Sequence, residues 1–584
     1  MIVNVIHRPG PGKQYEMFRL QQRIAHELNL KVTLLIPYDF MFDAEVDADL
    51  MRYHEAYGDE LGIWMGELTG GRMQQTVPSK EPFLWLHTKE NKVKILKEVL
   101  RKFRTVFGME PHCFGGYHMD AYSLSVLHEL CPAVEISIAG CFEEGVKVFH
   151  GCNNSWYLFN EGMPWGPWYP AKENSLRPAS SAEDWCGIVG VPHLSRDMAL
   201  SYEGRNDFFA SHPANVQRAM ANDGAVAPYT LNLLDVYRYQ ERFNDGFSYT
   251  NVFVGPNWLS GSANVQDSDE ITQGLYREYL EYYSVLQEEG SLQSMYLSEF
   301  AAWFRNNVPI GKAQVFDAKE ILYGSMKSYF WYCDCDMRVM FDLFQGCSIG
   351  DLRPYVARQP RCTGADMPQK MIGSNPYLIQ SQYRTGNAHH FADGARSTLI
   401  LSCGGEHIDL AGIPMTLQSV RHAEDMFILN LKPQILCFKN GTNVEFATEI
   451  MLRKGGIIEF RRRLLSVSGD ENQIFATEYV KGCWGTTEYP EEMRGLELKM
   501  IDTEQVRSIV YNYEGRILTG SGKSTIEVTV PQLETTIALS PLEGDFVQAE
   551  LEEGYLFNPY YTMKQTARIT QEKGMRTQLC MRKG

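Results

Sequence analysis

The stretch IVNVIH at residues 2–7 is an apolar run with the length and the β-branched residues of a buried strand. Apolar residues at helical spacing follow over Tyr15–Leu28, and a second apolar run, VTLLIP, occupies residues 32–37. Strand, helix and strand in this order predict a βαβ unit, in which the two strands lie parallel and the helix packs against them.

The same alternation continues through residue 310. Further strand-like runs are Leu61–Gly66, Cys113–His118, Val134–Cys141, Gly187–Pro192, Tyr249–Val254 and Ser294–Leu297. Helical stretches between them include Asn91–Phe107, Tyr122–Leu130 and Glu270–Glu288. Seven or eight such units predict a closed (β/α) barrel over residues 1–310, with the helices outside.

The pattern changes after the predicted barrel. Residues 311–376 are predicted to form a helical or irregular bridge, with a helix near Ala318–Phe330. From residue 377 to 584, short β runs are separated by Gly, Asn and Asp, which predicts a β-sandwich region. These runs are Thr398–Ser402, Phe427–Leu431, Ile457–Arg461, Val506–Tyr511, Ser524–Val530 and Thr535–Leu539.

Composition limits the partners of the chain. Its 584 residues are more than a single hydrophobic core accommodates, so the chain should form more than one domain. Its net charge of −17 disfavours binding to nucleic acid. No apolar run approaches the ~20 residues that span a bilayer, so no membrane partner is expected. Because a strand follows Met1 without a secretory signal, and 13 cysteines suit free thiols, we expect a cytoplasmic protein. A homo-oligomer is compatible with the sequence.

In a parallel barrel the active site lies at the carboxyl ends of the strands, and polar or aromatic residues follow most of the predicted strands. The candidates at these ends are His7, Arg8, Glu67, His118, Asp120, Glu143, His193, Arg196, Asn257, Trp258 and Glu299.

Three of these candidates carry ionisable groups suited to acid–base catalysis. Asp120 follows the fourth strand, but the same residue is also a common helix N-cap. Glu299 interrupts the apolar run Met295–Phe304, where a buried carboxylate needs partners that a functional site would supply. His118 is either a base, acid or donor, or a hydrogen-bonded structural histidine.

The loop Met163–Pro170 holds three aromatic residues between three prolines. Rigid, exposed aromatic rings would offer platforms to the C–H faces of a sugar, with Trp165 and Trp168 as the candidates. The alternative is that this loop packs as a plug over the barrel.

The segment Tyr57–Trp64, with the sequence YGDELGIW, follows an acidic helix and leads into the third predicted strand. Together with Gly115–Tyr122 and Trp165–Pro170, it resembles the polysaccharide-deacetylase-like barrel superfamily and its glycosidase relatives, in an uncharacterised bacterial branch. The resemblance covers about residues 1–310. It implies a barrel enzyme that acts on carbohydrate.

This chain departs from the deacetylase pattern at the metal ligands. Deacetylases of this superfamily hold a metal through an Asp of the first strand and two His after the third. Here the first strand ends in His7-Arg8, and the third is followed by the sequence MGEL at residues 65–68. The resemblance therefore favours the glycosidase relatives, for which two well-placed carboxylates suffice, and we expect no metal and no other cofactor.

The sequence thus leads to the hypothesis of an exo-acting glycoside hydrolase for an oligosaccharide or glycoconjugate. Asp120 and Glu299 would be the catalytic pair, with His118 as helper. If the two carboxylates face each other across the barrel, their wide separation predicts inversion of the anomeric configuration. Arg8 and Arg196 suit hydroxyls or the carboxylate of an acidic sugar.

Two alternatives remain open from the sequence. One is a metal-dependent carbohydrate deacetylase or hydrolase that uses His7, His118 and His193 with nearby carboxylates. The other is a carbohydrate-binding protein without catalytic activity. In either protein, the rings of Trp165, Trp168 and Trp258 would stack against the sugar.

Overall fold

The computed structural model describes residues 1–66, 68, 71–79, 81, 83–140, 163–193, 195, 197–199, 228–259, 269–321, 323–357, 377–380, 395–423, 425–484, 493–556 and 558–584. The chain forms two compact units. The first consists mainly of Met1–Lys312, and the second mainly of Ser325–Gln359 and Asn375–Gly584.

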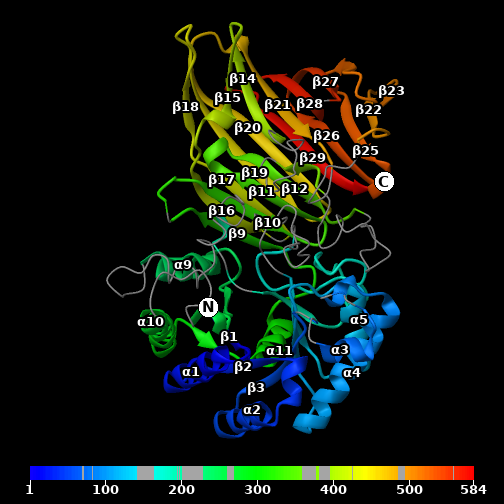
Figure 1. Ribbon diagram of the computed structural model, residues 1–584. Helices are drawn as coiled ribbons and strands as arrows, with labels where there is room; N and C mark the ends of the chain where they lie inside the picture. The colour runs from blue at the N-terminus through cyan, green and yellow to red at the C-terminus, as the bar shows by residue number, and fades with distance from the viewer. Residues whose placement is uncertain are drawn as a thin grey trace. The chain divides into compact units, whose positions relative to one another are not determined.

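The first unit is a parallel sheet whose strands alternate with helices (Figure 1). Its strands are β1 (Ile2–His7), β2 (Val32–Pro37), β3 (Glu60–Trp64), β4 (Cys113–Gly115), β5 (Ile136–Gly140), β6 (Val189–Pro192), β7 (Tyr249–Val252) and β8 (Gln293–Ser294). Its described α-helices are α1 (Lys13–Glu27), α2 (Ala44–Tyr57), α3 (Gly71–Thr76), α4 (Lys89–Phe107), α5 (Ala121–Leu130), α9 (Pro228–Tyr239), α10 (Asp269–Glu288) and α11 (Leu297–Asn307). The predicted βα alternation of this half is confirmed.

The closure predicted for the barrel is wrong. The strands lie in the order β6-β5-β4-β3-β2-β1-β7, and no described ladder joins β6 to β7. Side chains occupy this seam: the amide of Asn251 donates to the carbonyl of Pro192 at 2.7 Å, and the hydroxyl of Ser195 accepts from the backbone N–H of Asn251 at 3.0 Å. On the same side of β6, the backbone N–H and carbonyl of Gly190 bond the backbone of Trp168, both at 2.9 Å. Because these contacts use backbone groups that a ladder would need, the sheet stays open.

The last predicted strand also differs from expectation. β8 is only two residues long and pairs with Ile2 and Val3, at the amino end of β1. The main chain then turns at once into α11, whose first backbone N–H groups bond Thr33 and Glu60, near the amino ends of β2 and β3. The residues after β8 therefore lie at the end of the sheet opposite the carboxyl edge.

Helix α4 shows how sequence specifies these helices. Its apolar residues recur at intervals of three and four and are buried: Ile95, Leu96, Val99, Leu100, Phe103 and Phe107. Thr88 caps its start by accepting a hydrogen bond from the backbone of Asn91, and Gly108 ends it in the left-handed conformation. Lys92 lies on the same buried face and is 0% exposed.

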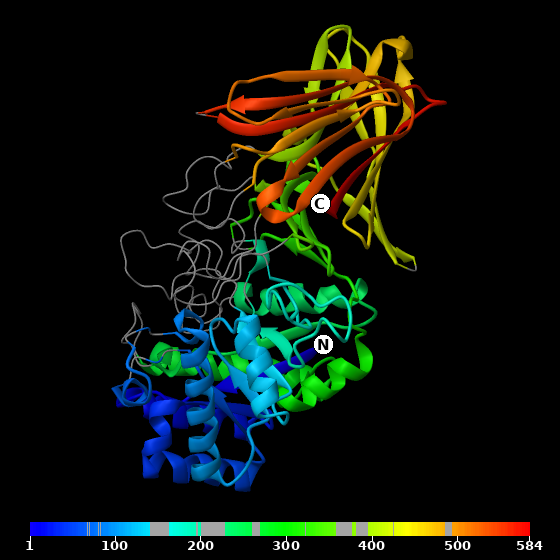
Figure 2. The same ribbon diagram turned by 90° about the vertical axis from the view of Figure 1, so that its right-hand side faces the viewer.

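The second unit consists of two antiparallel sheets (Figures 1 and 2). Its strands are β9 (Gln314–Lys319), β10 (Ser328–Cys333), β11 (Met337–Asp342), β12 (Ser348–Pro354), β13 (Ile379–Gln380), β14 (Arg396–Cys403), β15 (Glu406–Asp409), β16 (Leu417–Ala423), β17 (Met426–Leu431), β18 (Gln434–Cys437), β19 (Asn443–Arg453), β20 (Ile457–Ser468), β21 (Ile474–Gly482), β22 (Glu497–Ile501), β23 (Val506–Val510), β24 (Ile517–Ser521), β25 (Thr525–Val530), β26 (Thr535–Glu543), β27 (Asp545–Tyr555), β28 (Asn558–Arg568) and β29 (Met575–Lys583). The β-rich structure predicted from residue 377 onward is confirmed, as antiparallel sheets.

The helix predicted near Ala318–Phe330 is wrong. β9 and β10 occupy this stretch and join β11 and β12 in one of the two sheets. The run SYFWYC at residues 328–333 is apolar at nearly every position and buried from Tyr329 onward. Such a run has no diagnostic period, so its pairing partners, which the local sequence does not reveal, decide between helix and strand.

The core of the second unit lies between the sheets. β21 alternates strictly between buried and half-buried residues, as a strand with one covered face must. Arg462 of β20 and Glu478 of β21, which belong to different sheets, form an ion pair at 3.0 Å with side chains 4% and 0% exposed. This pair links the two inner faces. None of the helices in the described part of the chain has the length and apolar composition that crossing a bilayer requires.

Candidate functional site

Five side chains from five strand ends meet at the carboxyl edge of the parallel sheet. We call Arg8, Trp64, Tyr117, His193 and Phe253 the mouth cluster. The Trp64 ring lies edge-to-face with Tyr117 at 5.3 Å and with Phe253 at 5.1 Å between ring centroids. The His193 ring lies 5.0 Å from both the Tyr117 and the Phe253 rings. The Arg8 guanidinium lies over Trp64, 5.4 Å from its centroid.

The mouth cluster has an apolar floor and a polar rim. Trp64 and Phe253 are buried at 3% and 4% exposure, whereas Arg8, Tyr117 and His193 are half-buried. Aromatic faces bind apolar surface, and the guanidinium, phenol and imidazole donate or accept hydrogen bonds beside them. The arrangement suits a ligand that has both C–H faces and hydroxyl groups.

Two further predicted residues lie beside the mouth cluster. Asn257 and Trp258, at the start of the 3-10 turn Pro256–Leu259, are half-buried. A methyl group added at Gly255 would lie 2.5 Å from the Asn257 amide oxygen, 3.3 Å from Trp258 and 3.5 Å from the Arg8 guanidinium. Gly255 therefore lets these three side chains approach one another at the rim. The structure thus brings four of the predicted residues together here, namely Arg8, His193, Asn257 and Trp258.

Asp120 lies on the same edge of the sheet but inside the protein. It caps α5 by accepting from the backbone N–H of Ser123 at 3.1 Å, and it pairs with the Lys92 ammonium at 2.9 Å. Burial by itself raises the pKa of Asp120, but Lys92 and Ser123 outweigh that effect and hold the pKa below its usual value. Its carboxylate therefore stays ionised in a closed ion pair, and the helix-capping interpretation of this residue is confirmed.

His118 and His7 are also enclosed. His118 is 5% exposed, and burial lowers its pKa to about 4. His7 is fully buried between the hydroxyl of Tyr276, 2.8 Å from Nε2, and the amide of Gln22, 2.9 Å from Nδ1. Burial lowers the His7 pKa to about 3, so this ring is neutral and lies behind the site rather than in it.

Glu299 does not share the mouth with Asp120, and the prediction that the two carboxylates face each other is wrong. Glu299 lies in the first turn of α11 and accepts from the backbone N–H of Tyr296 at 3.1 Å. It pairs with Lys31 at 2.7 Å with 41% of its side chain exposed. Lys31 directly precedes β2, so Glu299 lies at the amino ends of the strands. The short β8 is the cause, because it never reaches the carboxyl edge.

The aromatic loop is packed rather than exposed, so its predicted stacking role is wrong for two residues. Trp168 is 1% exposed, donates its indole N–H to the Ser175 carbonyl at 2.8 Å and forms a bridge with Gly190 of β6. Trp165 is 3% exposed. The hydroxyl of Tyr169 donates to the carbonyl of Val308 at 2.7 Å, which fixes the loop beside the end of α11. The loop is therefore packed, as in the alternative, but its contacts are with β6 and the end of α11.

Glu67, Glu143 and Arg196 lie outside the described residues. In the described part of the chain, no three His, Cys, Asp or Glu side chains lie close enough to hold a metal ion. The set His7, His118 and His193 proposed for a metal-dependent enzyme is therefore not assembled.

Sequence reasoning missed Trp64, Tyr117 and Phe253 as site residues, although each stands within the last three residues of a predicted strand. Their signal was an aromatic residue at that position in three different strands. It also missed Lys92, whose signal was a cation on the apolar face of a helix.

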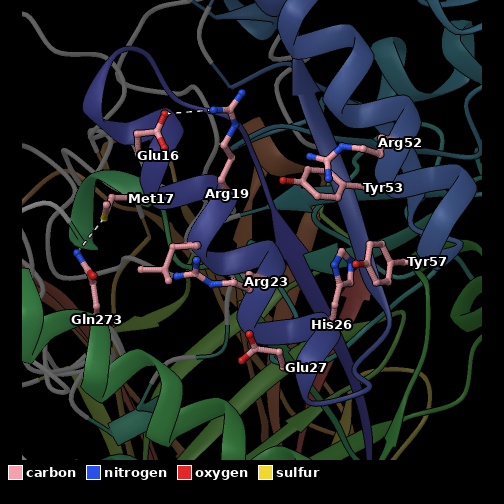
Figure 3. A pocket seen from close by; sticks show the side chains of 11 residues that line it. Glu16, Met17, Arg19, Arg23, His26, Glu27, Arg52, Tyr53, Tyr57 and Gln273 are labelled. Carbon is pink, nitrogen blue, oxygen red and sulfur yellow. Dashed lines mark hydrogen bonds and ion pairs between the residues drawn. The ribbon is translucent and has the colours of Figure 1, made fainter.

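A groove lies on the helical layer of the first unit. It has a volume of about 790 Å³ and runs along α1, with α2 on one side and Gln273 of α10 on the other (Figure 3). Its Arg19 is paired with Glu16, Glu45 and Asp49, and its Tyr57 stacks on His26 at 3.7 Å. Since most charges there are paired within the protein, the groove has no clear preference for a charged ligand.

Neither a protein-family model nor a curated protein matches the sequence. Among solved structures, a candidate glycoside hydrolase/deacetylase from Parabacteroides distasonis has a TM-score of 0.49 and 11% identity, covering 66% of this chain and 92% of its own. The 4-alpha-glucanotransferase of Thermococcus litoralis has a TM-score of 0.27 and 9% identity, covering 100% of this chain and 99% of its own. The galactose 1-epimerase of Lactobacillus acidophilus NCFM has a TM-score of 0.26 and 8% identity, covering 47% of this chain and 99% of its own. At these identities and TM-scores, the likenesses assign no activity to this chain.

Proposed function

We propose that this protein is a carbohydrate-active enzyme, and a glycoside hydrolase in the first instance, whose substrate binds at the carboxyl edge of the open barrel. The mouth cluster carries the proposal. Its buried Trp64 and Phe253 form the floor. The half-buried Tyr117 and His193 rings lie against this floor and, with the Arg8 guanidinium, offer partly exposed aromatic surface and hydrogen-bonding groups. A sugar ring, with C–H faces and a hydroxyl edge, has the matching distribution of apolar and polar surface.

His193 is the group in the mouth cluster best suited to move a proton. Its imidazole is half-buried, so it can reach both a ligand and solvent. An imidazole has one ring nitrogen that accepts a proton and one that donates a proton, which suits it to general acid–base catalysis. Arg8 beside it would bind a hydroxyl or a sugar carboxylate, consistent with an acidic sugar as substrate.

Exo action on an oligosaccharide or glycoconjugate stays part of the proposal. Inversion of configuration does not, because its geometric basis was a pair of carboxylates facing each other and Glu299 lies at the opposite end of the sheet.

A panel of chromogenic glycosides, including uronides and sialosides, tests the proposal on the full-length chain. We expect turnover of at least one glycoside, with release of single terminal sugars. His193→Ala should lower kcat/KM at least ~10-fold, which corresponds to ~1.4 kcal/mol of lost transition-state stabilisation.

Glu299→Gln is the matched control, since it alters an ionisable group at the far end of the same unit. It should keep the wild-type kcat/KM. Turnover that is insensitive to His193→Ala, or absent with every glycoside, would count against the proposal.

A further inference from the structure

A second group of side chains lies behind the mouth cluster and is short of hydrogen-bond partners. It consists of Trp85, His87, Lys92 and His118, with Asp120 as counter-ion, and we call it the inner polar cluster. Trp85 belongs to the short turn Leu84–Leu86 just before α4, whereas His118 and Asp120 follow β4. All five side chains are at most 5% exposed.

The contacts show that these side chains are neighbours. The Trp85 ring lies edge-to-face on His118 at 5.6 Å, and the Lys92 ammonium lies 2.9 Å from Asp120. His87 follows Trp85 by two residues and directly precedes Thr88, the N-cap of the helix that carries Lys92. The positive charge of Lys92 contributes to lowering the pKa of both His118 and His87. Burial is the larger cause of both shifts, so both rings are neutral at physiological pH.

Three polar atoms of the inner polar cluster have no hydrogen-bond partner among the described residues, namely Trp85 Nε1, His87 Nδ1 and His118 Nδ1. The Lys92 ammonium is paired with Asp120 at 2.9 Å, which leaves its other N–H groups to donate elsewhere. A buried polar group without a partner is costly, and protein interiors leave few of them. Several at one place indicate that a polar ligand completes them.

The hydrogen-bonding pattern selects the class of ligand. The Trp85 indole and the Lys92 ammonium only donate. The Nε2 atom of His87 lies 3.1 Å from the Glu81 carbonyl, which only accepts, so Nε2 carries the proton and Nδ1 of this neutral ring accepts. An anion offers only hydrogen-bond acceptors, so it would leave the acceptor atom Nδ1 of His87 without a donor. A hydroxyl group both donates and accepts, and several of them satisfy the whole set.

A chain of aromatic rings connects the two clusters. Tyr117 of the mouth cluster contacts Phe83 at 6.4 Å, and Phe83 stacks on Trp85 at 4.4 Å. Tyr117 and His118 are also consecutive residues. Phe83 therefore lies between Tyr117 of the mouth cluster and Trp85 of the inner polar cluster.

We infer that the inner polar cluster is a subsite that binds the hydroxyl groups of a neutral sugar ring, with Trp85 and Lys92 as donors and His87 as an acceptor. The inference deepens the proposed function and rests on it for the location of the substrate. It assigns to the inner subsite a preference for neutral, hydroxylated rings, whereas Arg8 at the rim is the group available to a carboxylate.

Calorimetric binding to the full-length protein tests the subsite separately from turnover. The probes are glucose, galactose and mannose, their monodeoxy analogues, and glucuronate as an anionic comparator. Trp85→Phe removes the indole N–H and keeps an aromatic ring. We expect it to weaken binding of the preferred neutral sugar about 5- to 10-fold, the usual effect of one lost hydrogen bond. One monodeoxy analogue should bind wild type and Trp85→Phe equally, because it lacks the hydroxyl that the indole meets.

Tyr117→Phe is the matched control, since it removes one hydroxyl from the mouth cluster. It should leave the difference between that deoxy analogue and its parent sugar unchanged. Equal binding of every probe by wild type and Trp85→Phe, or no binding of any neutral sugar, would overturn the inference and leave ordered water as the occupant. Sugar binding that depends on Trp85 without turnover of any glycoside would uphold the subsite and refute the hydrolase.

Discussion

The ion pair between Lys92 and Asp120 gives the sharpest test of how the site is built. Both side chains are buried, at 0% and 5% exposure, and their charged atoms are 2.9 Å apart. Asp120→Asn keeps the N-cap of α5, because Asn caps a helix as well as Asp does, but it leaves the Lys92 charge buried without a partner. Removal of one partner from a buried pair costs about 3–5 kcal/mol. Asp120→Ala should cost about 1 kcal/mol more, through loss of the cap.

Hydrogen exchange of the full-length protein measures this loss unit by unit. A cost of 3–5 kcal/mol corresponds to about 10²- to 10⁴-fold faster exchange for amides of α4 and α5 that exchange by opening of the first unit. Peptides from β19 and β20 of the second unit serve as the internal control. The double variant Lys92→Met/Asp120→Asn should recover most of the protection, since it leaves no buried charge.

The opposite result would restore a catalytic role for Asp120. If Asp120→Asn left exchange unchanged while turnover fell by 10²-fold or more, the carboxylate would act on substrate, and the reasoning from its closed ion pair would be refuted.

Two further predictions concern pH and the second unit. The folded pKa of His7 is about 3, below the ordinary value of about 6.5, so between these values the unfolded chain binds a proton that the folded protein does not. This group should therefore lower the free energy of unfolding by about 1.4 kcal/mol per pH unit as the pH drops below about 6.5. Thermal unfolding at several pH values measures this slope, and His7→Gln should reduce it. An unchanged slope would argue against a buried, neutral His7. In the second unit, Arg462→Met and Glu478→Gln should each cost about 3–5 kcal/mol, and a double replacement by apolar residues should recover most of it. Denaturant unfolding measures these changes in the free energy of unfolding. Wild-type stability of either single variant would show that the ion pair is not buried between the two sheets.

Local patterns were sufficient for the elements of the parallel sheet. The runs at residues 2–7 and 32–37 became β1 and β2 with the bounds expected, because a buried parallel strand needs a continuous apolar run and little else. The stripe of α4, with Thr88 before it and Gly108 after it, fixed a helix in the same way. The β runs after residue 377 were also readable, since alternation marks strands with one covered face.

Which residues meet at the site depended on where strands end and which of them pair, and no local pattern contains that information. The sequence by itself determined the βα alternation of the first unit, the β-rich character of the second, and that polar residues stand at strand ends. Only the tertiary structure decided that the sheet stays open at the seam of Asn251 and Ser195, and that β8 stops after two residues. Strand pairing depends on backbone hydrogen bonds between segments far apart in the sequence. It places Glu299 at the amino ends of the strands and Arg8, Trp64 and His193 together at the carboxyl edge.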